Sequence, residues 1–481
     1  MSDIKIERLD AFRWIIPPVG GMRVPGLIYA DERMIKAMGK DESPKQVANV
    51  AHLPGIIGHS LAMPDIHWGY GFPIGGVAAF DMEEGIISPG GVGYDINCGV
   101  RLMATNLQIG EIKDKLRELV IALFRNIPAG VGSEGACKLS VDEEKKVLRQ
   151  GAAWAVGRGY GSEGDLARTE DGGAMQGADP TYVSARALER GRRQLGTLGS
   201  GNHFLEIEVV EEIFDRRVAS AFGLTAEGQV AVAIHTGSRG FGYQVCDDYL
   251  ARMVKRSSAL DFPLPDRQLA CAYLASDEGK EYMAAMACAA NYAWANRQIL
   301  MHRTAQTFEK TLQRSPRDIG MKLVYDVCHN IAKVEEFEIE GRKRRVCVHR
   351  KGATRALPPR HPLLPDVYRE AGQPVLIPGD MGTGAYVLVG TDRALEETFG
   401  STCHGAGRVM SRNRAMKASR NRSIAAEMAD RGVIVLAAGK KTLSEEMPEA
   451  YKDIEEVVNV VHRAGLSTKV ARLRAVGCIK G

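Results

Sequence analysis

The sequence predicts an α+β fold in which one large domain, residues 1–481, has central β-sheets, flanking helices and a two-metal site at strand ends. Helical and strand-like stretches alternate irregularly, and the apolar runs VAVAI and KLVYDV suit strands that are buried on both faces. Glycine-rich motif blocks recur from residue 63 to residue 480, without an internal repeat or a Pro/Ser linker between them. A site assembled from the whole length favours one domain over a string of modules.

The first third of the chain mixes short strands with helices. A helix over residues 31–50 is expected, and MPDIHWGYGFPIGGVAAF then forms a loop that leads into a strand. Residues 85–105 are expected to form a strand, a glycine-rich turn and a second strand. Amphipathic helices are predicted over residues 108–125 and 142–155. Residues 158–178, rich in Gly, Asp and Glu, are expected to form a long surface loop.

Helices and buried strands continue to the C-terminus. EEFEIEGRKRRVCVHRKG alternates in polarity and predicts a hairpin that turns near Glu340 and Gly341. The other expected elements are, in order, a basic helix over residues 183–194, a strand after GTLGSGN, a strand before His235, helices over 243–256 and 278–313, a strand before His329, two strands around PGDMGTG, helices over 405–430 and 447–463, and a strand in RLRAVGCIKG.

Composition restricts the class of protein. No apolar run approaches the roughly 18–20 residues of a membrane-spanning helix, so no membrane partner is expected. The charged N-terminus lacks the apolar core of a signal peptide, and the nine cysteines include no CxxC pair, which together predict a cytoplasmic protein with reduced thiols.

The net charge is only +4, but basic residues gather in two stretches. Residues 341–361 contain eight lysines or arginines and residues 401–426 contain six, with no acidic residue in either stretch. Such stretches are typical of a polyanion partner, although a solvated helix face or pairing with the protein's own acidic patches would produce the same pattern.

Five candidate metal ligands lie in or beside glycine- or asparagine-containing turns: Asp95, Cys98, His203, His235 and His329. Carboxylate, thiolate and imidazole form a mixed ligand set that suits Mn, Fe or Zn better than Mg or Ca, and Ni, Co or Zn could replace Mn. A thiolate can bridge two ions, so five ligands could serve an adjacent pair. The alternative is that each histidine is a hydrogen-bonded core residue, since spacing alone does not prove convergence.

His404 opens the block HGAGR, which is expected to begin a helix. Small residues at a helix N-terminus leave backbone N–H groups free for an anion, and a histidine beside phosphates can act as nucleophile or general base. The alternative is a plain glycine-rich helix entry. The chain has no GxxxxGK[ST], HExxH or GxSxG motif, so a Walker nucleotide site, a zincin protease and an α/β-hydrolase are unsupported.

Together these blocks resemble the RtcB family of RNA ligases over essentially the whole chain. The segments that carry the resemblance are MPDIHWGYGFPIGG, GGVGYDINCGVRL, GTLGSGNHFLE, HTGSRGFG, DVCHNIAK, HRKGATRA, PGDMGT, CHGAGR and GCIKG. The resemblance implies a GTP- and Mn²⁺-dependent ligase that joins RNA 2′,3′-cyclic phosphate or 3′-phosphate ends to 5′-hydroxyl ends, through a guanylylated histidine and an RNA-3′-ppG intermediate. It also implies tRNA halves or damaged RNA as substrates and an archease-type activator as a possible partner.

The family pattern also assigns residues. Asp95, Cys98 and His203 would hold one Mn²⁺, while Cys98, His235 and His329 would hold the second. His404 matches the nucleophile. The guanylate contacts implied are Asn202, His203, Phe204, Leu205, Glu206, His329, Asn330, Pro378, Gly379, Asp380, Met381, Ala385, His404, Gly405, Ala406, Gly407 and Lys480.

Glu206 would accept hydrogen bonds from the guanine edge. Many family members have Ser at the positions of Asp380 and near Ala385, and a carboxylate at 380 would repel a phosphate unless it faces elsewhere. The basic residues expected to contact RNA phosphates are Arg192, Arg193, Arg239, Lys351, Arg408 and Arg412.

Two further readings stay open. A dimetal phosphodiesterase could act on RNA 2′,3′-cyclic phosphates without ligation, and an RNA-binding scaffold could retain only the fold. The HGAG block argues against the first reading and the unbroken ligand set argues against the second. Covalent labelling by GTP separates both from a ligase, because neither alternative predicts a label.

Overall fold

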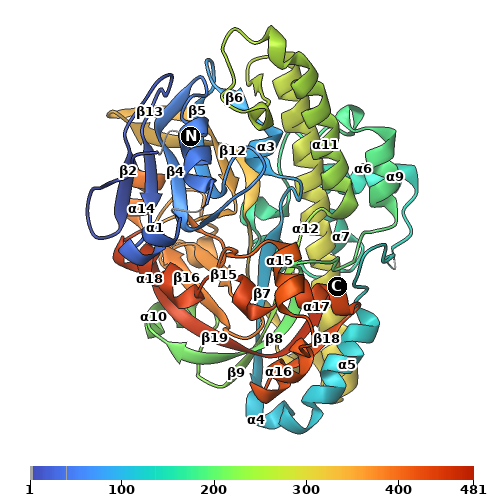
Figure 1. Cartoon of the computed structure of the whole chain (residues 1–481). Helices are drawn as coiled ribbons and strands as arrows, with labels where there is room; N and C mark the ends of the chain where they lie inside the picture. Colours follow the sequence, from blue (N-terminus) through green and yellow to red (C-terminus); the bar gives the residue numbers. More distant parts are fainter. Residues whose placement is uncertain (1–3, 39–40, 136) are drawn as a thin grey trace.

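The computed structural model describes residues 4–38, 41–135 and 137–481 and contains two large β-sheets (Figure 1). The seven-stranded sheet pairs strands from the N-terminal region with a hairpin from the middle of the chain. Its order is β1 (Glu7–Arg8), β2 (Arg13–Ile16), β3 (Gly26–Tyr29), β4 (Ile56–His67), β5 (Ile74–Asp81), β13 (Arg342–Lys351) and β12 (Asn330–Ile339).

The eight-stranded sheet is antiparallel except for one strand, β18 (Ile434–Ala437), which pairs in parallel with β19. The other seven strands are, in order, β11 (Lys322–Cys328), β7 (Gly99–Gln108), β9 (Gln229–Thr236), β8 (Phe204–Ile213), β19 (Ser467–Lys480), β16 (Ala385–Gly390) and β15 (Pro374–Pro378). Two small sheets pair β6 (Ile86–Ile87) with β10 (Ala272–Tyr273) and β14 (Ala353–Arg355) with β17 (Ser401–Cys403).

The longest helix, α12 (Asp277–Leu312), runs beside α11 (Arg239–Arg256) and packs on the eight-stranded sheet together with α5 (Leu116–Asn126) (Figure 1). Its Ala- and Met-rich sequence favours a helix, Ser276 caps its first turn, and Gln313 ends it with a φ of 54°. The other α-helices are α1 (Glu32–Met38), α2 (Ser43–Val50), α3 (Pro89–Val92), α4 (Ile109–Ile112), α6 (Val141–Gln150), α7 (Ala152–Gly157), α8 (Glu163–Leu166), α9 (Ala185–Arg192), α10 (Arg216–Ala221), α13 (Pro316–Ile319), α14 (Asp392–Thr398), α15 (Arg412–Ala418), α16 (Ile424–Asp430), α17 (Lys440–Glu445) and α18 (Ile454–Arg463).

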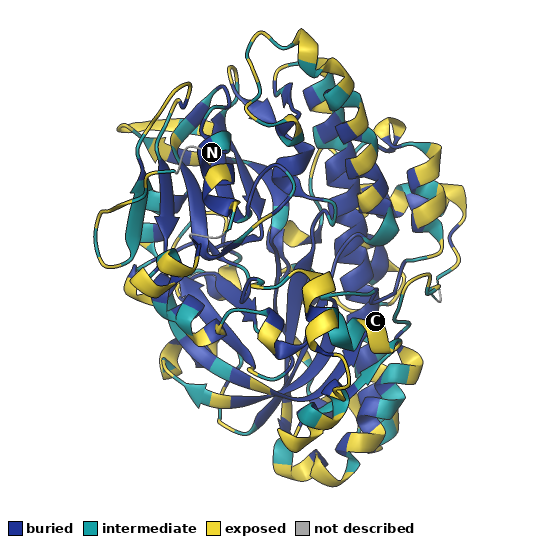
Figure 2. Ribbon diagram, viewed as in Figure 1, coloured by how far each residue is buried: buried dark blue, intermediate teal, exposed yellow. Residues whose placement is uncertain are grey.

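Burial follows this architecture. The central strands of both sheets and the inner face of α12 are buried, whereas the edge strands β1 and β2 and the outer helices are partly exposed (Figure 2). All eight residues of β9 are buried, because β7 and β8 flank it and apolar layers cover it on both faces. The expectation of a doubly buried strand before His235 is therefore confirmed. Within the described ranges, no helix is both long and apolar enough to cross a membrane.

The α+β class with central sheets and flanking helices is confirmed, but three local expectations were wrong. The helix expected over residues 31–50 is divided into α1 and α2, and residues 39–40 lie outside the described part of the chain. No helix starts at His404, because the chain from β17 to Ser411 forms a loop and α15 begins only at Arg412.

The third error concerns residues 158–178, which are not simply a surface loop. The segment contains α8 and a 3₁₀ turn, and Thr169 and Glu170 are buried. Glu170 accepts a hydrogen bond from Lys333 Nζ at 2.6 Å and another from the backbone N–H of Cys328 at 2.9 Å. Internal partners for the carboxylate allow this polar segment to be buried.

Candidate active site

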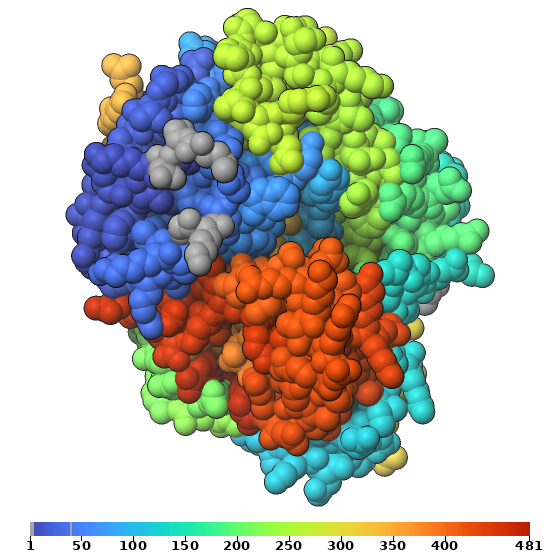
Figure 3. Space-filling view, in the orientation of Figure 1, coloured from blue at the N-terminus to red at the C-terminus, as the bar shows by residue number. Residues whose placement is uncertain are grey.

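A cavity of about 580 Å³ opens between the two large sheets and brings distant motif blocks together. In Figure 3 the blue N-terminal region and the orange-red C-terminal segment meet on this face of the molecule. The lining includes metal-ligand candidates from the DINC turn and from the ends of β9 and β11. It also includes the PGDM turn, the HGAG loop and Lys480 near the C-terminus. The cavity therefore joins the blocks that the sequence analysis singled out.

The first group of donors consists of Asp95, Cys98 and His203. Asp95 and Cys98 share a tight turn before β7, in which Asn97 has a φ of 53° and the Cys98 N–H donates to Asp95 O at 2.9 Å. His203 immediately precedes β8. Its Nε2 lies 2.9 Å from Asp95 Oδ2 and 3.4 Å from Cys98 Sγ.

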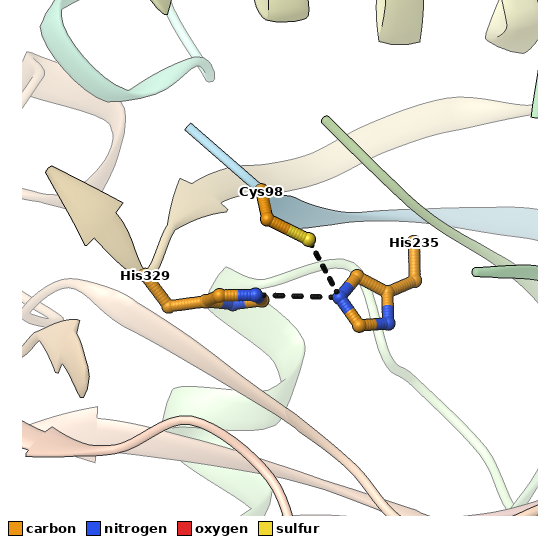
Figure 4. Close-up of side chains that lie close together, drawn as sticks. All are labelled: Cys98, His235 and His329. Atoms are coloured by element: carbon orange, nitrogen blue, oxygen red, sulfur yellow. Dashed lines mark hydrogen bonds between the residues drawn. The ribbon is translucent and has the colours of Figure 1, made fainter. Parts of the chain in front are cut away.

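The second group consists of Cys98, His235 and His329 (Figure 4). His235 lies near the end of β9, and His329 separates β11 from β12. His235 Nε2 lies 3.2 Å from Cys98 Sγ and 3.3 Å from His329 Nε2. Because the donor atoms of each group lie within 4.8 Å of one another and Cys98 belongs to both, the geometry suits two adjacent metal ions with a shared thiolate.

Protonation states fit the same use. Burial, reinforced by the neighbouring histidines, lowers the pKa values of His235 and His329 well below the ordinary value, so both imidazoles are neutral donors. Burial alone would raise the pKa of Asp95, but His203 and Arg239 lower it to about 2. Burial and then Asp95 raise the pKa of the Cys98 thiol, so metal binding at this sulfur has to displace a proton.

His404 lies next to His329 in the cavity lining, with 4.8 Å between the centroids of the two rings. Its Nδ1 is 2.5 Å from Oδ2 of Asp65, and the same oxygen accepts the backbone N–H groups of His404 (3.0 Å) and Gly405 (3.3 Å). Burial would raise the pKa of Asp65, but the contacts with His404 lower it, so the carboxylate is an acceptor only. Nδ1 of His404 therefore donates to Asp65, and in the neutral ring the lone pair is on Nε2.

The HGAG segment is shaped by close packing rather than by a helix. Gly407 has a φ of 72°, and a Cβ at this position would lie 2.1 Å from the carbonyl oxygen of Asp65. The Gly405 N–H is already bound to Asp65. The expected anion site at a helix N-terminus is therefore absent from this described segment, since these long-range contacts and not helix geometry hold the loop.

Most of the nucleotide-contact candidates line the cavity: Asn202, Phe204, Glu206, His329, Asn330, Pro378, Gly379, Asp380, Met381, His404, Gly405, Ala406, Gly407 and Lys480. Three others do not. His203 lies among the metal-ligand candidates, Leu205 packs in the apolar core beneath the eight-stranded sheet, and Ala385 borders a separate, very small cavity.

Glu206 and Lys480 face the same part of the cavity. They lie on adjacent strands, β8 and β19, where Glu206 is paired with Cys478 and Lys480 with Phe204. Burial raises the pKa of Glu206 to about 7, although Lys480 acts to lower it. Lys480 Nζ lies 5.7 Å from the centroid of the Phe204 ring.

Asp380 turns its carboxylate toward its own loop. Oδ1 accepts the backbone N–H of Gly382 at 2.7 Å, and Oδ2 accepts the Thr383 hydroxyl at 2.7 Å. Burial raises the pKa of Asp380, while these two bonds oppose the shift. A carboxylate held in this way stabilises the turn after β15, and the repulsion expected toward a phosphate is reduced by its orientation.

The basic RNA-contact candidates occupy different surroundings. Lys351, Arg408 and Arg412 line the cavity, but only Arg412 has a largely exposed side chain, at 57%. Lys351 is buried, and its Nζ donates to the backbone carbonyls of Tyr70 (2.5 Å) and Phe72 (3.0 Å). Burial lowers the pKa of Lys351 to about 7.

The other basic candidates are bound to protein groups. Arg408 donates to Glu446 and to Tyr451, both at 3.1 Å. Arg239 Nη1 donates to His203 Nδ1 at 3.0 Å, so the neutral ring carries its proton on Nε2, beside Asp95, and metal binding at Nε2 has to displace that proton. Arg192 and Arg193 lie outside the cavity lining and pair with Glu144 and Glu134, each at 3.2 Å.

Two contributions were missed by the sequence analysis. Asp65 was quoted within a motif but given no role, although its contact with His404 joins residues 339 positions apart. Arg297, on α12, donates to the backbone carbonyls of Asn97 (2.8 Å) and Thr236 (2.9 Å), beside the ligand candidates Cys98 and His235. The only local signal for Arg297 was a charged residue on an otherwise apolar helix face.

Comparison with known proteins gives a consistent result. Residues 46–481 match the model of a family described as "tRNA-splicing ligase RtcB". Proteins of that name from Thermococcus kodakarensis, Archaeoglobus fulgidus and Aeropyrum pernix are 53%, 52% and 51% identical to this chain, over 99% of the chain and 99% of each relative. The matched range contains the metal-ligand candidates and His404.

Proposed function

The chain belongs to the RtcB family of tRNA-splicing ligases, and from that premise we propose that this RNA ligase joins RNA 2′,3′-cyclic phosphate or 3′-phosphate ends to 5′-hydroxyl ends with GTP and Mn²⁺. The proposed substrates are tRNA halves, in keeping with the name of the relatives, and broken RNAs in repair. An archease-type activator is part of the proposal. The free state of all nine cysteines is compatible with a reducing compartment such as the cytoplasm.

The contact between Asp65 and His404 is the observation that carries the proposal. A carboxylate that accepts Nδ1–H fixes the tautomer and directs the Nε2 lone pair of His404 outward. In the proposed first step, Nε2 attacks the α-phosphorus of GTP, a P–N bond forms, and the bond to the pyrophosphate leaving group breaks. Asp65 stabilises the positive charge that develops on the imidazole, much as the aspartate of a catalytic triad does.

Two metal ions fit the donors beside His404. Asp95, Cys98 and His203 would hold one ion, and Cys98, His235 and His329 would hold the other. When bound, the ions supply charge neutralisation for phosphoryl oxygens and for the departing pyrophosphate. Arg297 keeps two of the ligands oriented through the backbone, at Asn97 next to Cys98 and at Thr236 next to His235.

The guanine edge is assigned to Glu206, because its buried carboxylate can accept N–H groups that adenine does not present in that arrangement. Lys480 lies beside Glu206, and its positive charge offsets that of the carboxylate, so this part of the cavity can still accept an anionic nucleotide. In the second step the RNA 3′-phosphate takes GMP from His404. The 5′-hydroxyl then attacks that phosphate, and GMP leaves. A cyclic phosphate must first be opened to a 3′-phosphate.

Arg412, Arg192 and Arg193 are the proposed phosphate contacts with partly or largely exposed side chains. Each phosphate that they neutralise should lower the logarithm of the RNA affinity by about 0.7 per tenfold rise in salt. Lys351, Arg408 and Arg239 have protein partners, and we expect them to influence RNA mainly through the shape of the cavity.

Incubation with GTP labelled at the α-phosphate, in the presence of Mn²⁺, tests the first step. The wild-type protein should acquire a label that acid removes and alkali preserves, as expected of a phosphoramidate. His404→Ala should acquire none, and His361→Ala, altered in a loop outside the cavity lining, should label normally. Absence of label on the wild type, with an archease-type activator present, would favour the phosphodiesterase reading.

A further inference from the structure

We propose that Trp68 is a stacking platform for a nucleobase of one of the RNA ends that meet at the metal centre. The inference rests on the proposed function, and it concerns how the substrate is placed, not how His404 is guanylylated. Its starting point is an exposed indole at the mouth of a cavity that also contains His404 and Cys98.

Trp68 is 56% exposed, although tryptophan is a largely buried residue type. A single exposed aromatic residue needs no explanation by itself, but this one lines the cavity that holds the metal-ligand candidates. The cavity aromatics Tyr70 and Tyr94 pack edge to face, with 5.9 Å between their centroids, and Tyr94 stacks on Tyr243 at 4.8 Å. Across the described part of the chain, Trp68 has no such aromatic or cationic partner.

The backbone beneath Trp68 is held firmly. Lys452 Nζ donates to the carbonyls of Pro64 (2.9 Å) and Ile66 (2.6 Å), on the N-terminal side. On the C-terminal side, the buried Gln46 accepts the Gly69 N–H at 3.0 Å and donates to the Gly69 carbonyl at 2.6 Å. An exposed side chain on such a fixed segment can bind a flat partner with little loss of backbone entropy.

The position of Trp68 near His404 and the metal-ligand candidates suits a base at the end of an RNA strand. Asp65 is only three residues before Trp68, so the indole lies on the same segment as the carboxylate that contacts the nucleophile, His404. An RNA end whose terminal phosphate reaches the metal centre must place its adjoining base within the cavity or at its mouth. Unpaired bases stack on aromatic rings irrespective of base identity, which suits a ligase that accepts ends of different sequence.

Binding of short RNAs to Trp68→Ala, Trp68→Phe and wild type tests the proposal. One oligonucleotide ends in a 3′-phosphate and the other in a 5′-hydroxyl, and each is also made with an abasic terminal nucleotide. Stacking worth about 1–3 kcal/mol per base predicts that Trp68→Ala binds one of the two RNAs roughly 5- to 140-fold more weakly than wild type. Trp68→Phe should retain most of the affinity. Tyr182→Ala, which removes an exposed aromatic residue outside this cavity, should match wild type.

The decisive comparison is between the effect of removing the base and the effect of removing the indole. The abasic end should weaken wild type and have little effect on Trp68→Ala, and the RNA that responds identifies the stacked end. Equal RNA binding by Trp68→Ala and wild type, or an abasic penalty of equal size in both proteins, would overturn the proposal. Labelling of His404 by GTP without RNA separates the two hypotheses: Trp68→Ala should label like wild type, and failure of both to label would instead refute the proposed function.

Discussion

Replacing Asp326 by asparagine would break the buried ion cluster beneath the metal-ligand candidates. The carboxylate is fully buried on β11. Its Oδ2 accepts from Arg101 Nε (2.7 Å) and Arg297 Nε (2.8 Å), and its Oδ1 accepts from Arg297 Nη2 (2.8 Å). The two guanidinium groups outweigh burial and lower the pKa of Asp326, so it is ionised in the folded protein. Asparagine keeps the shape but leaves two buried cations without their counter-ion.

Removal of one partner from a buried ion pair costs about 3–5 kcal/mol. For 481 residues, at about 2.1 cal/mol/K each, the unfolding entropy is about 1 kcal/mol/K, so Tm should fall by about 3–5 °C. Metal affinity should also fall, by about tenfold, because Arg297 would no longer hold the carbonyls of Asn97 and Thr236 in place.

Scanning calorimetry of the metal-free protein measures the first effect, and titration with Co²⁺, followed by its visible absorption, measures the second. Asp430→Asn, at an exposed position on α16, provides the control and should change stability by less than about 0.5 kcal/mol. A Tm within 1 °C of wild type, together with unchanged Co²⁺ affinity, would refute the role given to the cluster.

Three other changes give separate tests. Burial lowers the pKa of His349 to about 3, below the unfolded value near 6.5, so the unfolded state takes up the proton first as the pH falls. From pH 6 to pH 4 the free energy of unfolding of wild type should therefore fall by about 1.4 kcal/mol per pH unit relative to that of His349→Gln. Urea unfolding at each pH measures this difference, and a difference that does not change with pH would contradict it. By equilibrium dialysis, Cys98→Ala should weaken both metal sites and His203→Ala only one; loss of a single ion in Cys98→Ala would exclude a shared thiolate. Asp380→Ser should change GTP affinity, measured calorimetrically, by less than about threefold, and a tenfold gain would show that the carboxylate faces the phosphates.

Elements with local signals could be predicted from the sequence. The runs VAVAI and KLVYDV identified β9 and β11, and with them the strand ends that carry His235 and His329. The hairpin of β12 and β13 turns at Glu340 and Gly341 as expected, since both residues have positive φ. Helical periodicity likewise located α11 and α12.

Features made by long-range contacts could not be predicted in this way. The loop that contains His404 is fixed by Asp65 and by the backbone around Tyr451, far away in the sequence, so its glycines were mistaken for a helix entry. The burial of Glu170 depends on Lys333, which local polarity does not reveal. Nucleotide and metal identity came from family resemblance and remain proposals.

The fate of the 3′-terminal phosphate tests the proposed ligation most directly. RNA carrying a ³²P-labelled 3′-phosphate is incubated with a 5′-hydroxyl RNA, GTP, Mn²⁺ and the protein, and the product is treated with phosphatase. The account predicts that the label becomes resistant to phosphatase and lies at the new junction, and that His404→Ala forms no such product. A joined product that contains no label, because its junction phosphate came from GTP, would contradict the account. Loss of the label from the joined product on phosphatase treatment would contradict it as well.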